Sequence, residues 1–313
     1  MKKEKTQVVT KTSWKKAFKR DWQLYLMLLF PLAMVIIFSY AAYPGLRMVF
    51  MDYKPAKGYA GSDWVGMKTF VKIFKDADFH RALKSSIAFN LMDLVVGFPV
   101  PIILALILNE LRFPRFKKVT QTILYLPHFL SWVIIASVAY TMFRPSSGLV
   151  NIALMNWGVI DQGIPFLTEK YHWAVTYLLV GVWAGMGWGT IIYLAAITGI
   201  SGELYEAAMI DGANRWERMV HITLPGIKST VVTLLIMNLG RLMGSNFERL
   251  DQFGNTQVRD LQYQLAIYTF DKGLSGGKYS MATAVGLFQS LVGLALVLLS
   301  DKFAKKLGEE GLL

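Results

Sequence analysis

The sequence predicts an all-α integral membrane protein built as a bundle of six transmembrane helices. Of its 313 residues, 54% are hydrophobic and only 17% are charged, whereas soluble domains usually carry about a quarter charged residues. The apolar residues also gather in long runs, and a spanning helix needs roughly 20 of them. Four runs hold no charge and a fifth holds only Asp93: 22–46, 119–143, 171–202, 279–300 and, with the aspartate, 85–109.

These runs predict five clear spans. They are expected at about Trp22–Tyr43, Ser86–Leu108, Thr122–Phe143, Trp173–Ile197 and Ser280–Leu299. A weaker candidate, about Leu224–Phe247, is interrupted by Lys228 and Arg241. Lys228 can extend its ammonium group to the interface, but Arg241 lies deeper and needs water or a partner. Counting it gives six spans and places both basic termini on one side.

The charge distribution predicts the orientation. The net charge is +12, and residues 1–20 carry eight bases against Glu4: Lys2, Lys3, Lys5, Lys11, Lys15, Lys16, Lys19 and Arg20. Such a block before the first span favours a cytoplasmic N-terminus. The expected inner segments then hold 18 Lys and Arg and the outer segments 14, which is a modest bias. No nucleic-acid motif accompanies the basic residues, so a nucleic-acid partner is not expected.

One membrane domain is expected at 22–300, between a basic cytoplasmic tail at 1–21 and a cytoplasmic tail at 301–313. The chain has no cysteine, which excludes disulfides and thiol chemistry. Gly97, Pro99 and Pro101 interrupt the second span. Because proline inside a helix frees a carbonyl and bends the axis, we expect this span to line a cavity or pack on its neighbours.

A polar segment at 203–225 lies between the expected fourth and fifth spans. Ser201 can cap a helix whose first turn holds Glu203 and Glu206, where acidic groups suit the positive helix end. Asp211-Gly212 predicts a turn in which glycine tolerates a positive φ. A second helical stretch follows at Asn214–His221, and Pro225 suits the first turn of the next span. The product is a helix–turn–helix bracket exposed to the cytoplasm.

The residues of this bracket carry a family resemblance. A bare Glu-Ala-Ala says little, since these residues favour any helix, and the alternative is an ordinary cytoplasmic loop. The joint pattern resembles the EAA coupling loop of permease subunits from binding-protein-dependent ABC importers, in the maltose-type sugar and polysaccharide branch: Glu206, Ala207, Asp211, Gly212, Ala213, Ile222, Leu224 and Pro225. Three further stretches are similar to this branch: Trp64–Gly66, Tyr125–Phe129 and Gly286–Ser290.

The resemblance implies a type I permease of the bacterial cell membrane, in the lipid bilayer, with both termini cytoplasmic. It implies a second permease subunit, two ATPase subunits, an extracytoplasmic substrate-binding protein and a carbohydrate substrate. The residues expected to couple to the ATPase are Glu206, Ala207, Ala208, Asp211, Gly212, Ala213, Leu224 and Pro225. ATP and magnesium are expected on the partner ATPase, with no cofactor on this chain and no enzymatic activity of its own.

Motifs for other chemistries fail. A phosphate-binding loop needs Gly-x4-Gly-Lys-Ser/Thr. Gly226–Ser229 lacks the glycine before lysine, and Gly276–Tyr279 lacks the hydroxyl residue after it. The four histidines are scattered among different segments, so we expect no metal site: His80, His128, His172 and His221.

Polar residues inside spans are the candidates for a substrate path. Asn90 and Asp93 lie three apart on the second span and share a face. Asn238 and Arg241 lie on the fifth span and Gln289 on the sixth. The alternative is a structural ion pair between Asp93 and Arg241.

Two further alternatives stay open from the sequence. Gly181, Gly185 and Gly189 form a small stripe on the fourth span that suits packing within the chain or at a subunit interface. For the function, the alternatives to sugar import are the same transporter with a non-sugar cargo, a non-transporting membrane sensor and a membrane-embedded enzyme.

Overall fold

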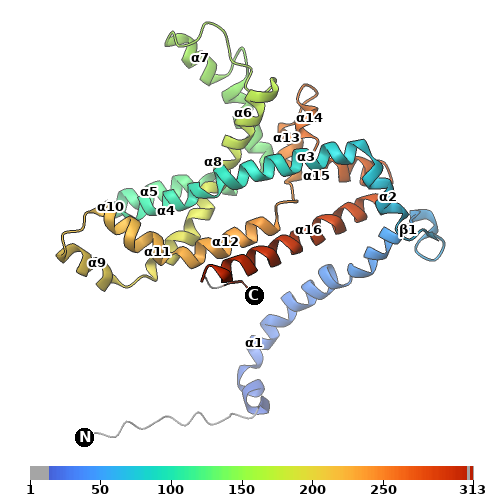
Figure 1. Cartoon of the computed structure of the whole chain (residues 1–313), viewed down its shortest axis with the longest axis horizontal. Helices are drawn as coiled ribbons and strands as arrows, with labels where there is room; N and C mark the ends of the chain where they lie inside the picture. The colour runs from blue at the N-terminus through green and yellow to red at the C-terminus, as the bar shows by residue number, and fades with distance from the viewer. Residues whose placement is uncertain (1–13, 309–310, 313) are drawn as a thin grey trace.

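The computed structural model describes residues 14–308 and 311–312, and these are almost entirely helical (Figure 1). Within them the one sheet is an antiparallel hairpin of β1 (Met51–Asp52) and β2 (Asp63–Trp64), closed by the short helix η3 (Pro55–Lys57). The all-α prediction is therefore confirmed. Residues 1–13 of the predicted basic tail lie outside the described residues.

Four helical stretches of the described chain are long and apolar enough to cross a bilayer. They are Phe18–Phe50, Ala77–Asn109, Lys170–Thr198 and Tyr279–Lys306, which correspond to the first, second, fourth and sixth predicted spans. Two further candidates are bent helix pairs, and the total reaches six if each pair forms one span. The predicted third and fifth spans are therefore not single straight helices.

The first span consists of α1 (Trp14–Val35), the π-helical η1 (Ile36–Tyr40) and the 3₁₀-helical η2 (Tyr43–Phe50). Its first part, α1, stands apart from the rest of the chain (Figure 1), whereas η2 packs on α16 and buries Val49 in the core. The backbone leaves helical geometry at Asp21, and Pro31 lies inside α1. No residue of its most apolar stretch is buried within the chain. This surface is left to lipid or to another subunit.

The second and fourth spans pack along each other. The second span comprises α3 (Ala77–Met92), the π-helical η4 (Asp93–Gly97) and α4 (Pro99–Asn109), and it follows the short outer helix α2 (Lys68–Lys75). The wide turn η4 directly precedes Pro99 and Pro101, where backbone donors are missing. The fourth span is α8 (Lys170–Thr198), which packs on α4 and η4.

The predicted third span is bent by 107°. Its parts are α5 (Pro114–Tyr125), η5 (Leu126–Phe129) and α6 (Trp132–Phe143), followed by the short helix α7 (Leu149–Asn156). Pro127 lies in the 3₁₀ turn, and Ser131 begins α6 by accepting a hydrogen bond from the Ile134 amide at 3.4 Å. Both signals lie inside the charge-free run 119–143 from which a continuous span was predicted.

The predicted fifth span is also bent and shorter than expected. The segment between α8 and α12 holds α9 (Gly202–Ile210), α10 (Arg215–Arg218), η6 (Met219–Thr223) and α11 (Leu224–Gly226), and α12 (Lys228–Gly240) follows after a bend of 58°. The prediction that this helix reaches Phe247 is wrong. α12 ends at Gly240, because tight turns replace the helix at 241–244.

The segment after α12 folds over the ends of the other helices. It contains α13 (Phe247–Phe253), α14 (Arg259–Gln262), α15 (Leu265–Tyr268) and η7 (Thr269–Ser275), and α16 (Tyr279–Lys306) returns beside α12. The larger apolar cluster joins this segment to α3 and α8 through fully buried side chains such as Phe79, Trp173, Leu250 and Tyr268. A smaller cluster at the other end holds Tyr193, Ile197 and Ile227.

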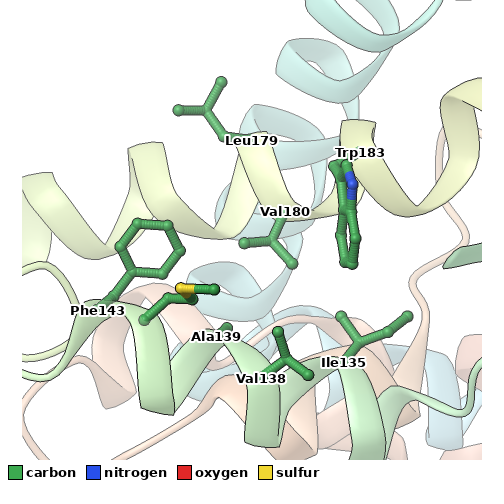
Figure 2. A pocket seen from close by; sticks show the side chains of 8 residues that line it. Ile135, Val138, Ala139, Phe143, Leu179, Val180 and Trp183 are labelled. Atoms are coloured by element: carbon green, nitrogen blue, oxygen red, sulfur yellow. The ribbon is translucent and has the colours of Figure 1, made fainter. Parts of the chain in front are cut away.

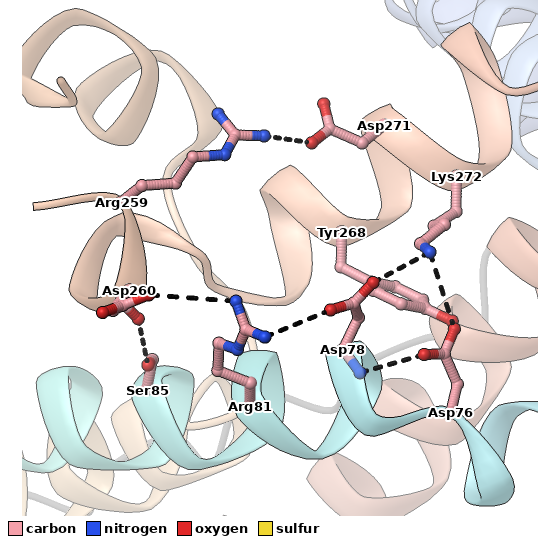
Figure 3. A network of polar contacts seen from close by, with 9 residues as sticks. All are labelled: Asp76, Asp78, Arg81, Ser85, Arg259, Asp260, Tyr268, Asp271 and Lys272. Atoms are coloured by element: carbon pink, nitrogen blue, oxygen red, sulfur yellow. Dashed lines mark hydrogen bonds and ion pairs between the residues drawn. The ribbon is translucent and has the colours of Figure 1, made fainter. Parts of the chain in front are cut away.

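An ion-pair network ties the segment 247–275 to the start of α3 (Figure 3). Lys272 lies 2.9 Å from Asp78, Arg81 lies 3.4 Å from Asp78 and 3.8 Å from Asp260, and Lys170 completes the network at 2.8 Å from Asp260. The hydrogen bond from Lys170 holds the pKa of the Asp260 carboxyl below its usual value. The network therefore favours the ionised form of this carboxylate.

Candidate functional site

The predicted bracket at 203–225 begins with α9, whose two ends are both capped. At its start the Ser201 hydroxyl accepts a hydrogen bond from the Glu203 amide at 3.3 Å, as the sequence predicted. At its end Gly212 has φ +82°, the Gly212 amide donates to the Met209 carbonyl, and the Ala213 amide donates to the Ala208 carbonyl at 2.8 Å. This pair of bonds is the Schellman arrangement, which requires a residue that tolerates positive φ. Gly212 thus fixes the turn of the bracket.

A reciprocal capping box starts the second arm of the bracket. The Asn214 side chain accepts from the Glu217 amide at 3.0 Å, and the Glu217 carboxylate accepts from the Asn214 amide at 2.7 Å. Arg218 donates to the Ala213 carbonyl at 3.2 Å, across the turn. Each device satisfies backbone groups that a helix end would otherwise leave open. The turn between the two arms is therefore held from both sides.

The bracket is braced internally and is also packed against the membrane helices. The Tyr205 hydroxyl on α9 lies 3.0 Å from the Thr223 hydroxyl on η6, which links the two arms. Ile227, directly before α12, is 1% exposed and packs in the cluster formed by α4 and α8. These contacts would carry a displacement of the bracket to the helices around it, because close-packed side chains transmit strain.

The outer surface of the bracket exposes small, acidic and apolar side chains. Glu206, Ala207 and Asp211 are exposed. Ile210 is 87% exposed and Trp216 is 68% exposed. Exposed large apolar residues beside acidic groups are typical of a protein-binding surface. The structure thus brings the predicted coupling residues of α9 and its turn together on one projecting element (Figure 1), with Leu224 and Pro225 at the return to the membrane helices.

Four of the five predicted path residues line one cavity of about 470 Å³ between the second, fourth and fifth spans. They are Asn90, Asp93, Asn238 and Arg241. Aromatic surfaces from Phe98, Trp188 and Tyr193 complete the wall. A concave site with a few polar groups among apolar and aromatic walls is typical of small-ligand binding. We refer to it as the central cavity.

The fifth predicted path residue, Gln289, lies outside the wall of the central cavity. Its amide nitrogen donates a hydrogen bond to the Met243 carbonyl at 2.6 Å, which braces the turn after α12 against α16. Asn90 supports the same turn from the other side, donating to the carbonyls of Leu242 and Gly244 at 2.8 and 2.7 Å. Each side chain supplies a donor to carbonyls that the end of the helix leaves unpaired.

Asp93 pairs with Arg249, a residue that the sequence reasoning did not select. The two side chains are 2.9 Å apart, and Arg249 also donates to the Tyr177 carbonyl at 2.6 Å. The guanidinium lies over the Tyr177 ring, 3.8 Å from its centre. The suggested pair of Asp93 with Arg241 is not formed. Arg249 was overlooked because it lies in α13, beyond the apolar runs, and the chain returns it to α8 only through tertiary folding.

Glycine in the fourth span allows this arginine to reach the interior. A Cβ atom on Gly181 would collide with the Arg249 guanidinium, and one on Gly189 would lie 2.9 Å from Pro101. By contrast, a Cβ atom on Gly185 would meet nothing within 4 Å. The glycine stripe therefore serves contacts inside the chain at two of its three positions.

An aromatic contact supports the wall of the central cavity. Trp188, which lines the cavity, stacks on His128 with ring centres 4.6 Å apart.

A separate apolar groove lies on another part of α8. It has a volume of about 340 Å³, runs between α6 and α8, and is lined by Ile135, Val138, Leu179, Trp183 and their apolar neighbours (Figure 2). Its wall carries no ionisable side chain, so the charged groups of this region belong to the central cavity.

Comparison with known proteins agrees with this architecture. Residues 97–308 match the family described as binding-protein-dependent transport system inner membrane component. The chain is 42% identical over 289 residues to the polygalacturonan/rhamnogalacturonan transport system permease protein YteP of Bacillus subtilis, covering 92% of this chain and 89% of the relative. It is 39% identical over 300 residues to protein LplB of the same organism, covering 96% and 94%.

A solved structure is similar over nearly the whole chain. It is a chain of a bacterial ABC transporter involved in the import of the acidic polysaccharide alginate, with a TM-score of 0.82 and 36% identity over 94% of this chain and 99% of that one. The same similarity holds for the alginate transporter in complex with an alginate pentasaccharide-bound periplasmic protein.

Proposed function

Because the chain belongs to the family of binding-protein-dependent transport system inner membrane components, we propose that it passes a carbohydrate across the bacterial cell membrane as one permease subunit of an ABC importer. The observation that carries the proposal is the central cavity, in which amide groups, two charged side chains and aromatic faces meet. Hydroxyl-rich sugars need hydrogen-bonding groups, and their rings pack on apolar faces. The relatives named above for transport of polygalacturonan, rhamnogalacturonan and alginate support the same cargo class.

The inner bracket is the proposed docking point for the ATPase. Glu206, Ala207, Ala208, Asp211, Gly212 and Ala213 would meet the ATPase surface, while Leu224 and Pro225 would carry its motion into α12. The exposed Ile210 suits an apolar pocket on that partner. ATP and magnesium would bind on the two ATPase subunits, and hydrolysis would take place there rather than on this chain.

Closure of the ATPases would move the bracket, and the contacts of Tyr205 with Thr223 and of Ile227 with α4 and α8 support transmission to the central cavity. The cavity would then open outward to receive cargo from the extracytoplasmic binding protein. A second permease would form the facing wall. In this arrangement both termini are cytoplasmic, in keeping with the basic N-terminal block.

Uptake by the reconstituted importer tests the proposal. Proteoliposomes would contain both permeases and the ATPase subunits, with ATP inside and the binding protein outside. Uptake of labelled carbohydrate should require both ATP and the binding protein. Uptake of a non-carbohydrate in its place would favour the alternative cargo. Assembly with all partners but transport of no cargo would favour a sensor.

A further inference from the structure

The charges of the central cavity do not cancel. Of the residues that line it, Asp93 and Arg241 are the two with ionised side chains. Asp93 is already neutralised by Arg249, whose guanidinium lies 2.9 Å from the carboxylate and is itself 9% exposed, behind the wall. Arg241 is exposed, and in the described part of the chain no carboxylate lies within 4 Å of it. This chain's wall of the cavity therefore presents one positive charge that no carboxylate of the described residues compensates.

We infer that Arg241 binds a carboxylate of the cargo, so that this importer selects oligosaccharides built from acidic sugars. The inference rests on the proposed carbohydrate function and specifies its chemical class. A planar guanidinium matches a carboxylate with two parallel hydrogen bonds. A neutral hydroxyl can accept one such bond, but it leaves the cation without a counter-charge in a site with mostly apolar walls.

The surroundings of Arg241 suit one acidic sugar unit. Asn238 lies one turn earlier on α12, and its amide donates to the Leu234 carbonyl at 2.8 Å, which leaves its oxygen directed to other donors. That oxygen can accept from a sugar hydroxyl. Trp188, on the α8 wall, supplies an aromatic face for the ring. The three side chains thus provide a carboxylate partner, a hydroxyl partner and a stacking surface.

A second explanation of the position of Arg241 does not involve the cargo. It follows the last residue of α12, and a cation near a helix C-terminus is stabilised by the final carbonyl groups. These dipoles favour the arginine, but they carry no full negative charge. A residue that served only the helix end would be replaceable by lysine and glutamine without any effect on which cargo is bound. This difference makes the two readings separable.

The test measures binding to the assembled importer in nanodiscs, held outward-open with a non-hydrolysable ATP analogue. The probes are trisaccharides of galacturonate, mannuronate or glucuronate, each beside its methyl ester, which has the same frame without the charge. At least one acid should bind about tenfold or more tightly than its ester, as expected for one charge-assisted contact. Arg241→Gln should remove this preference. Arg241→Lys should keep part of it, and the control Asn238→Ala should weaken acid and ester alike.

The outcomes separate this inference from the carbohydrate function. Equal binding of acid and ester by the wild type, or a preference that survives Arg241→Gln, would overturn the role of Arg241 while leaving carbohydrate uptake intact. Failure of Arg241→Gln to assemble with the second permease would also overturn it, by assigning the arginine to the subunit contact. Carbohydrate transport itself would be rejected only if the importer took up another class of cargo and no sugar.

Discussion

The pair of Asp93 and Arg249 offers a sharp test of the interior of this permease. At an effective dielectric constant of about 20, unit charges 2.9 Å apart attract by about 6 kcal/mol. Desolvation offsets much of this, and breaking a buried pair typically costs about 3–5 kcal/mol. Arg249 has a side chain 9% exposed, whereas Asp93 is 32% exposed toward the central cavity. The cation is therefore the partner that tolerates isolation less well.

Asp93→Asn should destabilise the subunit by about 3–5 kcal/mol, because it leaves the buried guanidinium without its counter-charge. Arg249→Gln should cost less, about 2–3 kcal/mol, because water in the cavity can reach the remaining carboxylate. The double variant should be more stable than the sum of the single effects predicts, by about 2–3 kcal/mol. The measurement is the free energy of unfolding of the reconstituted subunit in mixed micelles titrated with SDS.

A control cycle uses Asp93→Asn with Arg241→Gln. Since the structure forms no pair between these two residues, their effects should add to within about 0.5 kcal/mol. The reasoning would be refuted if the Asp93–Arg249 cycle were additive and the Asp93–Arg241 cycle were not. That result would restore the ion pair that the sequence suggested.

Glycine substitutions in α8 perturb the Asp93–Arg249 pair without removing a charge. Gly181→Ala places a methyl group where the Arg249 guanidinium lies, whereas Gly185→Ala adds one to open space. Gly181→Ala should therefore displace the arginine and destabilise the subunit by about 1–3 kcal/mol, the range for overpacking. Gly185→Ala should be close to neutral. Equal stability of the two variants would contradict the position of Arg249 against α8.

Three further predictions concern coupling, topology and pH. Gly212→Val forces a branched residue into positive φ, so the stimulation of ATP hydrolysis by loaded binding protein should be lost. The control Gly202→Val has open space and an ordinary φ, so it should retain this stimulation. Cysteines at Ala56 and Thr256, both exposed, should react with an impermeant reagent from outside in intact cells, and labelling only after lysis would reject the six-span topology. Because Lys170 lowers the pKa of Asp260, the contact of α14 with α8 should hold fully above the ordinary carboxyl pKa of about 4 and weaken as the pH falls through the lowered value. Amide exchange in α14 should accelerate there, and Asp260→Asn should abolish the change.

Much of the architecture was accessible from composition alone. Uninterrupted apolar runs predicted four of the long helices, because the length of a spanning helix is set by bilayer thickness. The bends were harder to predict. The 107° bend before α6 depends on a 3₁₀ turn and on Ser131, and hydropathy averages over both. The early end of α12 was missed for a related reason, since apolar residues continue past Gly240 while the backbone turns.

Ser62 shows that a place in a loop does not ensure exposure. It lies between the first two predicted spans, which the six-span topology with a cytoplasmic N-terminus puts outside, and polar loop residues are usually exposed. In the structure its hydroxyl donates to the Gly58 carbonyl at 2.6 Å and accepts from the Lys54 amide, and the residue is 9% exposed. Local hydrogen bonding within the hairpin removes it from solvent, so Ala56 is the better labelling position.

The central cavity shows which part of a site the sequence can supply. Spacing along one helix placed Asn90 beside Asp93, because residues three apart share a face. Which charges meet across helices depends on how helices pack, and Asp93 found its partner 156 positions away rather than in the adjacent span. That exchange of partners has a consequence for function. Had Asp93 neutralised Arg241, the cavity would be uncharged and suited to neutral sugars. With Arg249 in that role, Arg241 is left to select the charge of the cargo.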